Sequence, residues 1–219
     1  MACTKATLRC EGSTSYLRDL APCCLSHIRT MVVEIGKLLD AAGITWWLDY
    51  GTLLGAVRNG GIIPWDKDAD AGFWWQDAPR FRALVRGWTQ NPVNPGRPAG
   101  MLTAGMAGDL YVMEKQTSHP REVYSGGDSF KVNWSDRNRT CVDYFGWALK
   151  DGIVSRERYH VVDRYKGREF PVERLLPLGR IQWEGVLLPC PADPEWFCEH
   201  RYGSKWRTPK RQNNEGVKR

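Results

Sequence analysis

The feature that most constrains this chain is Ile44–Trp75, a stretch in which a small-residue turn is followed by closely spaced acidic residues. Asp68 and Asp70 are separated by a single alanine. If this segment is a strand, both carboxylates lie on the same face, because successive side chains of a strand point to opposite faces. Carboxylates placed in this way can bind a hard cation such as Mg²⁺ or Mn²⁺. We therefore predict a strand that carries a metal site.

The segment before the acidic pair has the pattern of an anion site. Apolar residues predict a buried strand that ends near Asp49, after which Thr52 is expected to cap a short helix, Leu53–Arg58. Backbone amides at the start of a helix favour an anion, so Gly51, Thr52 and Gly55 are candidate ligand-binding residues. A lone acidic pair or a Gly-x-x-x-Gly spacing also occurs on ordinary surfaces and in helix packing. Together, the strand, turn, helix and acidic strand predict a metal-bound phosphate site.

A resemblance to a known family adds to this interpretation. The runs DYGTLLGAVR (49–58), IIPWD (62–66) and DAD (68–70) resemble the signature of the LicD family, and the similarity extends over Pro22–Pro209. The chain departs from the family pattern at Asn59, where a histidine is common, and at Lys67, where a third acid is frequent. The resemblance implies an α+β fold with a nucleotidyltransferase-like mixed sheet flanked by helices.

A third acidic residue is a candidate for the same site. Asp143 lies between Val142 and Tyr144 in a strand-like run, and a buried carboxylate is costly unless it is paired or coordinated. A surface aspartate on an edge strand would fit the same pattern. The LicD pattern has an aspartate at the matching position, which implies that Asp68, Asp70 and Asp143 together bind Mg²⁺ or Mn²⁺. Because Asp143 is on a different strand from the other two, it is also the candidate general base.

Three further residues are assigned to donor binding. Arg58 and Lys131 are basic residues that can pair with phosphate, although exposed basic side chains are commonly just solvated. Asp66 is included with them as part of the matched motif. The remaining cysteines are expected to be buried thiols rather than ligands: Cys141, Cys190 and Cys198.

Four cysteines lie within the first 24 residues: Cys3, Cys10, Cys23 and Cys24. Four thiolates can complete a tetrahedral zinc shell and stabilise a segment with little core of its own. Disulfides would use the same residues, and the spacing does not separate the two interpretations. A member of the LicD family carries a similar cysteine group that ends in an adjacent pair, so the resemblance favours structural Zn²⁺. We expect a cysteine-rich zinc segment over 1–24, a catalytic domain over 25–209 and a basic tail over 210–219.

The rest of the chain predicts helices and strands in a mixed order. Apolar residues from Leu25 recur at helical spacing until Gly43 ends the helix. Asp77 and Pro79 open a second helix, whose inner face is expected to hold Phe81, Leu84, Val85 and Trp88. We also expect a loop at 91–100, strands at 109–113, 129–134 and 140–149, a hairpin at 180–189 and a helix from Pro194 to Gly203.

Charge and hydropathy argue against two classes of protein. The formal charge of +6 is concentrated in residues 204–219, which hold six Lys or Arg against one Glu, so we expect no nucleic-acid partner. No apolar run approaches the roughly 20 residues of a membrane helix, and the first residues lack a signal-peptide core. As given, the chain is expected to be soluble, cytoplasmic if complete and in the Golgi lumen if part of a secretory protein. Two sequons, at Asn133 and Asn138, would permit glycosylation in a secretory compartment.

The resemblance implies a metal-dependent phosphotransferase. Its donor would be a CDP-linked alcohol, its acceptor a hydroxyl of a glycan or glycoconjugate, and the transferred group a phosphoalcohol such as ribitol 5-phosphate or phosphocholine. The metal would offset the charge of the diphosphate while the nucleoside monophosphate leaves. Two alternatives stay open: a nucleotidylyltransferase, which would use the same acids, and a non-enzymatic zinc-containing binding module. The four histidines are scattered and predict no catalytic triad.

Overall fold

The computed structural model describes residues 3–8, 18–91, 102–115, 129–156 and 169–211. Its helices are α1 (Pro22–Ala41), α2 (Tyr50–Asn59), α3 (Ala78–Ala83), α4 (Val172–Leu175) and α5 (Pro194–Tyr202), with a short 3-10 helix, η1, at Trp75–Asp77. Its strands are β1 (Trp46–Leu48), β2 (Asp68–Trp74), β3 (Arg86–Asn91), β4 (Leu102–Ala107), β5 (Leu110–Lys115), β6 (Ser129–Asn133), β7 (Cys141–Lys150), β8 (Ile153–Ser155), β9 (Phe170–Pro171), β10 (Gly179–Trp183) and β11 (Val186–Cys190).

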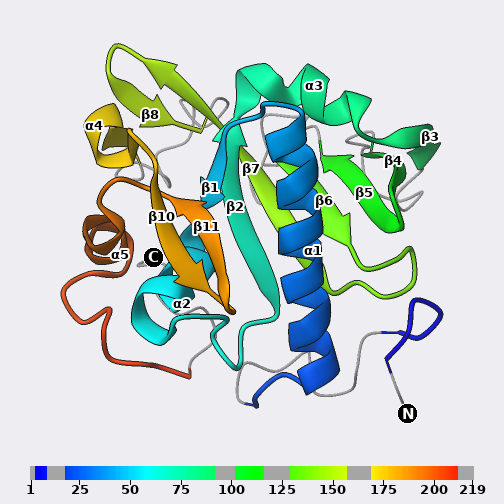
Figure 1. Cartoon of the computed structure of the whole chain (residues 1–219), viewed down its shortest axis with the longest axis horizontal. Helices are drawn as coiled ribbons and strands as arrows, with labels where there is room; N and C mark the ends of the chain where they lie inside the picture. Colours follow the sequence, from blue (N-terminus) through cyan, green and yellow to red (C-terminus); the bar gives the residue numbers. More distant parts are fainter. Residues whose placement is uncertain (1–2, 9–17, 92–101, 116–128, 157–168, 212–219) are drawn as a thin grey trace, which may run out of the picture.

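A mixed sheet forms the centre of the molecule. Within the described ranges it has nine strands in the order β1-β2-β7-β6-β5-β4-β3, with β8 paired to β7 and β9 paired to β8. Strands β2 and β7 run parallel, and the other neighbouring pairs are antiparallel. Strands β10 and β11 form a separate hairpin beside α2 and α5 (Figure 1). This architecture confirms the predicted α+β fold with a mixed sheet flanked by helices.

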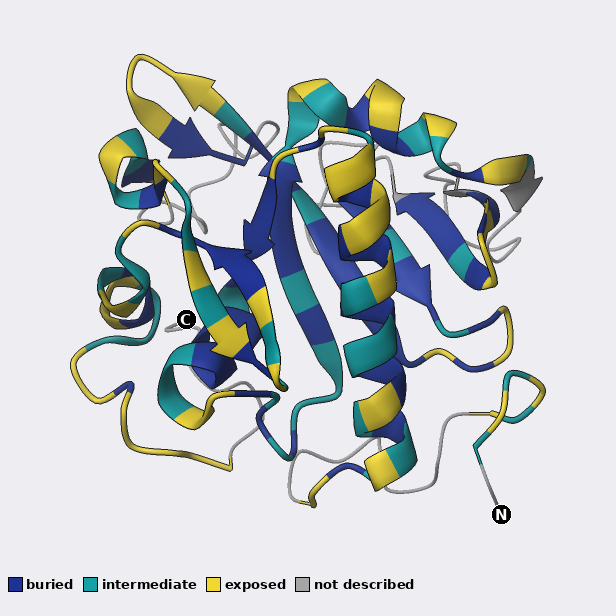
Figure 2. Cartoon of the chain, in the orientation of Figure 1, coloured by how far each residue is buried: buried dark blue, intermediate teal, exposed yellow. Residues whose placement is uncertain are grey.

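Helix α1 lies across one face of the sheet (Figure 1). Its inner side is apolar at helical spacing and is buried along its length (Figure 2). Gly36 allows α1 to approach the sheet closely, because a Cβ at this position would lie 2.5 Å from the Trp46 ring. Trp46 is the register partner of Phe73, and Ala71 is the partner of Tyr144, so these apolar side chains share the face under α1. The alternate residues of β2 and β7 therefore lie on the opposite face.

Most predicted elements are confirmed. The first predicted helix is α1, and Gly43 follows it with a φ of 63°, in the left-handed region that stops a helix. The runs at 129–134 and 140–149 are β6 and β7, which pair antiparallel. The hairpin at 180–189 is β10–β11, and Glu184 and Gly185 form its turn with φ values of 49° and 76°. Asp193 caps α5 by accepting a hydrogen bond from the Trp196 N–H at 3.1 Å.

Two predictions about helices are wrong. Helix α2 starts at Tyr50, and its cap is Asp49 rather than Thr52, because the Asp49 carboxylate accepts from the Tyr50 N–H at 2.9 Å. The second predicted helix ends at Ala83, and Trp88 lies in β3. Gly87, with a φ of 66°, lies where the register of β3 with β4 shifts, and the pairing of these strands overrides the apolar helical spacing.

Several predictions lie wholly or partly outside the described residues. Asn91 ends β3, and the rest of the predicted loop, 92–100, is not described. The same holds for Cys10 and for residues 212–219 of the predicted basic tail. In the described parts of the chain, no helix is both long enough and apolar enough to cross a membrane.

Candidate active site

The start of α2 is built on a buried ion pair. The side chain of Asp49 is 0% exposed, and the guanidinium of Arg201 on α5 donates to its Oδ1. The indole N–H of Trp147 on β7 donates to Oδ2 at 3.1 Å. One carboxylate therefore fixes α2 relative to both β7 and α5. Neither Asp49 nor Arg201 was among the predicted site residues, because residues 152 positions apart carry no local signal of contact.

Tyr50 adopts an uncommon backbone conformation at the first position of α2. Its φ is 39°, in the left-handed region that residues other than glycine seldom adopt. The Arg201 guanidinium lies 4.0 Å from the centre of the Tyr50 ring, and the Phe145 ring packs edge-on at 5.2 Å. Such a conformation costs on the order of 1–3 kcal/mol and persists where its surroundings determine it. These contacts therefore hold the first turn of α2 against β7.

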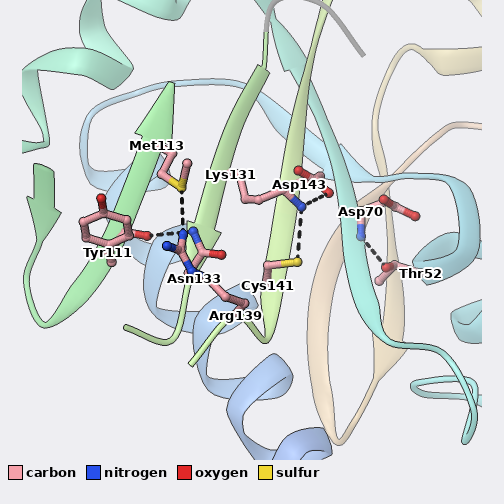
Figure 3. A network of polar contacts seen from close by, with 9 residues as sticks. All are labelled: Thr52, Asp70, Tyr111, Met113, Lys131, Asn133, Arg139, Cys141 and Asp143. Atoms are coloured by element: carbon pink, nitrogen blue, oxygen red, sulfur yellow. Dashed lines mark hydrogen bonds and ion pairs between the residues drawn. The ribbon is translucent and has the colours of Figure 1, made fainter. Parts of the chain in front are cut away.

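Asp66 and Asp70 converge on this first turn. The Gly51 N–H donates to Asp70 Oδ2 at 3.3 Å, and the Asp70 N–H donates to Thr52 Oγ1 at 2.7 Å. A Cβ on Gly51 would lie 2.7 Å from Asp66 Oδ2 and 3.7 Å from Asp70 Oδ2. A side chain at position 51 would therefore displace the Asp66 carboxylate. In Figure 3, the Asp70 carboxylate and Thr52 lie on the same side of strand β2.

A second group of ligand atoms comes from Asp68, Cys141 and Asp143. These atoms lie within 4.8 Å of one another. The parallel pairing of β2 and β7 explains the group, because Asp68 is the register partner of Cys141, and Asp70 is the partner of Asp143. On the next strand, β6, the Nζ of Lys131 lies 2.6 Å from Asp143 Oδ2 and 3.3 Å from Cys141 Sγ (Figure 3). The structure thus brings Lys131 and the three predicted acids to one face of the sheet.

Cys141 is a site residue that the sequence interpretation missed. It is buried, as predicted, but its sulfur adjoins the acidic residues instead of lying in the apolar core. The available signal was its spacing of two from Asp143, which puts both side chains on one face of a strand.

Burial and crowded negative charge dominate the electrostatics of this site. Burial, and then four neighbouring carboxylates, raise the pKa of Asp70 well above its usual value. Burial lowers the pKa of Lys131, but the charges of Asp143 and its neighbours raise it by more, so the ammonium stays charged. Burial raises the pKa of the Cys141 thiol to about 12, so this thiol is neutral near neutral pH. The carboxylates that act on Asp70 belong to Asp68, Asp66, Asp143 and Asp49.

The chemistry of these donors fits a hard divalent cation. Asp68 and Asp143 offer carboxylate oxygens, which Mg²⁺ and Mn²⁺ prefer as ligands. A bound cation would also offset the repulsion that raises the pKa of Asp70. A neutral thiol is a poor ligand for such an ion, so Cys141 would be a neighbour of a bound cation rather than one of its preferred donors.

Two predicted donor-binding residues lie away from the first turn of α2. A Cβ on Gly55 would lie 2.4 Å from the carbonyl oxygen of Gly61, so the glycine is required where α2 packs on the turn that follows it. Arg58 is in the last turn of α2, where its Nε donates to Asn59 Oδ1 at 2.9 Å and its Nη1 donates to the Trp206 carbonyl at 3.4 Å. These contacts indicate packing roles for both residues.

Three of the four predicted zinc ligands gather at the start of α1. The sulfurs of Cys3, Cys23 and Cys24 lie within 4.8 Å of one another, whereas Cys10 is outside the described residues. Two sulfurs on one tetrahedral Zn²⁺ are about 3.8 Å apart, given Zn–S bonds of about 2.3 Å. The adjacent pair Cys23 and Cys24 can therefore reach a common point, and this donor set fits zinc.

Both predicted sequons are buried. Asn133 is 1% exposed, and its Nδ2 donates to the Tyr111 carbonyl. Asn138 is 0% exposed, and its Nδ2 donates to Cys3 Sγ. Neither side chain is accessible as a glycan acceptor in the folded chain, so the structure does not favour the glycosylation that the two sequons would permit.

The chain is similar in sequence to known proteins. Residues 43–193 match the family model "LicD/FKTN/FKRP, nucleotidyltransferase domain". Ribitol 5-phosphate transferase FKRP of Homo sapiens is 31% identical over 209 residues, which are 92% of this chain and 38% of that protein. The FKRP of Mus musculus is 30% identical over 209 residues, again 92% of this chain and 38% of that protein. The chain therefore spans 38% of the length of these two relatives. Ribitol-5-phosphate transferase FKTN of Mus musculus is 49% identical over 41 residues, 19% of this chain and 9% of that protein.

One solved structure shows a weaker similarity. The lincomycin-bound lincosamide antibiotic adenylyltransferase LnuA is 13% identical in sequence, with a TM-score of 0.39 over 74% of this chain and 79% of that chain.

Proposed function

This chain belongs to the LicD family of nucleotidyltransferase domains, and from that premise we propose that it transfers a phosphoalcohol from a CDP-linked donor to a glycan hydroxyl. Similarity to ribitol 5-phosphate transferases supports ribitol 5-phosphate as the transferred group, with phosphocholine as the other candidate. The observation that carries the proposal is the convergence of acidic side chains beside the first turn of α2: Asp66, Asp68, Asp70 and Asp143. Carboxylates that hold a cation, with a lysine beside them, are suited to phosphoryl transfer.

Three of the acidic residues would share one task in this proposal, and Asp143 would have a second. Asp68, Asp70 and Asp143 would hold Mg²⁺ or Mn²⁺, which when bound supplies charge neutralisation at the diphosphate. The Gly51 N–H and the Thr52 hydroxyl fix Asp70 through its carboxylate and its backbone. Asp143 is also positioned by its ion pair with Lys131, and it would accept the proton of the attacking glycan hydroxyl.

Lys131 contributes a positive charge next to Asp143 on this face of the sheet. Its ammonium is anchored by Asp143 and is only 20% exposed, so it can contact a phosphate oxygen without a large loss of side-chain freedom. Asp66, the other residue assigned to donor binding, would contact the donor at the first turn of α2, next to the Gly51 backbone. The site would thus bind the diphosphate through one lysine and a cation.

We also propose that Cys3, Cys10, Cys23 and Cys24 bind one structural Zn²⁺ per chain. The close approach of the three described sulfurs supports this proposal. Elemental analysis of the isolated protein is expected to give about one zinc per chain, because metal binding and folding are coupled in such sites. Two intact disulfides in this segment, found by mass spectrometry after mild isolation, would exclude the zinc site.

A thermal-shift experiment tests the donor site. CDP with Mg²⁺ should stabilise the wild-type protein, by about 2.7 kcal/mol at a ligand concentration of 100 times Kd, because the ligand binds only the folded form. Asp68→Asn and Asp70→Asn should lose the metal-dependent part of this shift. Asp151→Asn is the matched control, since Asp151 is an exposed residue in the turn between β7 and β8. Absence of any shift in the wild type, or equal shifts in all variants, would contradict the proposed site.

A further inference from the structure

The N-terminal segment, residues 3–8, packs against the turn that joins β6 to β7. The Ser135 hydroxyl donates to the Lys5 carbonyl at 2.6 Å, and the Lys5 ammonium lies 4.8 Å from the centre of the Trp134 ring. The Asn138 side chain donates to the Thr4 carbonyl at 3.4 Å. This turn leads directly into β7, which carries Asp143. The segment that holds Cys3 is therefore attached to a turn that borders the candidate active site.

Asn138 lies closer to the Cys3 sulfur than two other polar side chains near it. Its Nδ2 lies 3.0 Å from Cys3 Sγ, whereas Thr7 Oγ1 and His27 Nδ1 lie 3.9 Å and 3.8 Å away. The side chain of Asn138 is fully buried, and its other end is also used, because Oδ1 accepts from the Thr140 N–H at 3.2 Å. An amide with both ends held in this way has a fixed direction, so its N–H is aimed at the sulfur rather than merely near it.

We propose that Asn138 is a positioning residue of the cysteine cluster: its amide N–H holds the Cys3 sulfur in the orientation that binds Zn²⁺. This inference rests on the proposal that the cysteines bind zinc. A hydrogen bond to a charged acceptor is about twice as strong as one between neutral groups, and a zinc-bound sulfur carries negative charge. Hydrogen-bond partners of metal ligands typically change metal affinity by about 10–100-fold when they are removed.

The proposal also explains the residue type at position 138. Aspartate would keep the oxygen that accepts from Thr140 but would present an oxygen to the sulfur, and alanine would supply no donor. Asparagine provides the acceptor and the donor at the two ends of one side chain. The sequon Asn138-Arg139-Thr140 is thus a structural motif in this chain.

Zinc release to a chelator tests the proposal on the full chain. Asn138→Ala should bind zinc about 10–100-fold more weakly than the wild type. Arg137→Ala is the control, because Arg137 is exposed in the same turn and its contact with Ser135 is made by its backbone. Equal zinc affinity in Asn138→Ala, Arg137→Ala and wild type would overturn the role of Asn138 while leaving the zinc site itself intact.

A second measurement requires no variant and so does not depend on whether Asn138→Ala folds. In wild-type protein with ¹¹³Cd²⁺ in place of zinc and ¹⁵N-labelled asparagine, the Asn138 side-chain N–H should show scalar coupling to cadmium across the hydrogen bond to sulfur. An Asn138 amide without this coupling, in protein that binds cadmium, would overturn the proposal. Failure of the wild type to bind zinc or cadmium would overturn the zinc site together with it.

Discussion

Replacing Arg201 with methionine is expected to destabilise the protein strongly, because it leaves a buried carboxylate without its cation. The side chains of Arg201 and Asp49 are 6% and 0% exposed. Asp49 would keep its hydrogen bonds from Trp147 and from the backbone of Tyr50, but these bonds do not neutralise its charge. Removing one partner of a buried ion pair costs about 3–5 kcal/mol.

Arg207→Met is the matched control. Arg207 pairs with Glu195 at 2.6 Å, but these side chains are 61% and 64% exposed. An exposed ion pair contributes about 0–1 kcal/mol. Both variants make the same change of side chain and remove one positive charge, so the difference between them reports the effect of burial.

Urea unfolding followed by tryptophan fluorescence measures both free energies of unfolding. In thermal melts, Arg201→Met should lower Tm by roughly 6–20 °C, since 1 kcal/mol corresponds to about 2–4 °C for a protein of this size. Adding Asp49→Asn to Arg201→Met should recover part of the loss, because the uncompensated charge is then removed. Equally small losses in Arg201→Met and Arg207→Met would refute the reasoning.

Three other predictions concern the acidic site. Asp70→Asn should stabilise chelator-treated protein at pH values above the folded-state pKa of Asp70, since it removes a half-buried charge that other carboxylates crowd. Because the folded-state pKa of Asp70 is raised, its protonation stabilises the wild type fully below the unfolded pKa of about 3.9, and this stabilisation is lost as pH rises through the folded-state pKa. The Tm values of wild type and Asp70→Asn, measured at a series of pH values, should therefore diverge as pH rises. Parallel curves of Tm against pH would count against the crowding of charge at this site. Gly51→Ala should weaken metal-dependent binding of CDP in calorimetry, because its Cβ would lie 2.7 Å from Asp66 Oδ2, and unchanged affinity would contradict this geometry. Cys141→Ser should retain Mg²⁺-dependent binding of CDP, since a neutral thiol is a poor ligand for a hard cation, and a large loss in calorimetry would make the sulfur a ligand.

Local patterns were sufficient to predict much of the fold. Helix α1 follows from apolar residues at helical spacing, and the hairpin β10–β11 follows from a Glu-Gly turn between apolar runs. The same reasoning failed at Trp88, where an apolar residue at helical spacing lies in a strand. The pairing of β3 with β4 decides that position, and a pattern confined to neighbouring residues does not report it.

The candidate site was predictable in part, for a similar reason. The placement of Asp68 and Asp70 on one face follows from alternation along a single strand. The convergence of Asp68 with Cys141 and Asp143 depends on the parallel pairing of β2 with β7, and the Asp49–Arg201 pair depends on the packing of α5. These are contacts between distant segments, and only the family resemblance pointed to any of them, at Asp143.

The most direct test of the proposed function is the mass of the products formed from CDP-ribitol and a glycan acceptor with Mg²⁺. We expect release of CMP and an acceptor that gains ribitol phosphate, in the wild type and in Asp151→Asn but not in Asp68→Asn. An acceptor that gains a nucleoside monophosphate would instead identify a nucleotidylyltransferase. Ribitol phosphate transfer that continues unchanged in a chelator, or in Asp68→Asn, would contradict the metal-dependent mechanism.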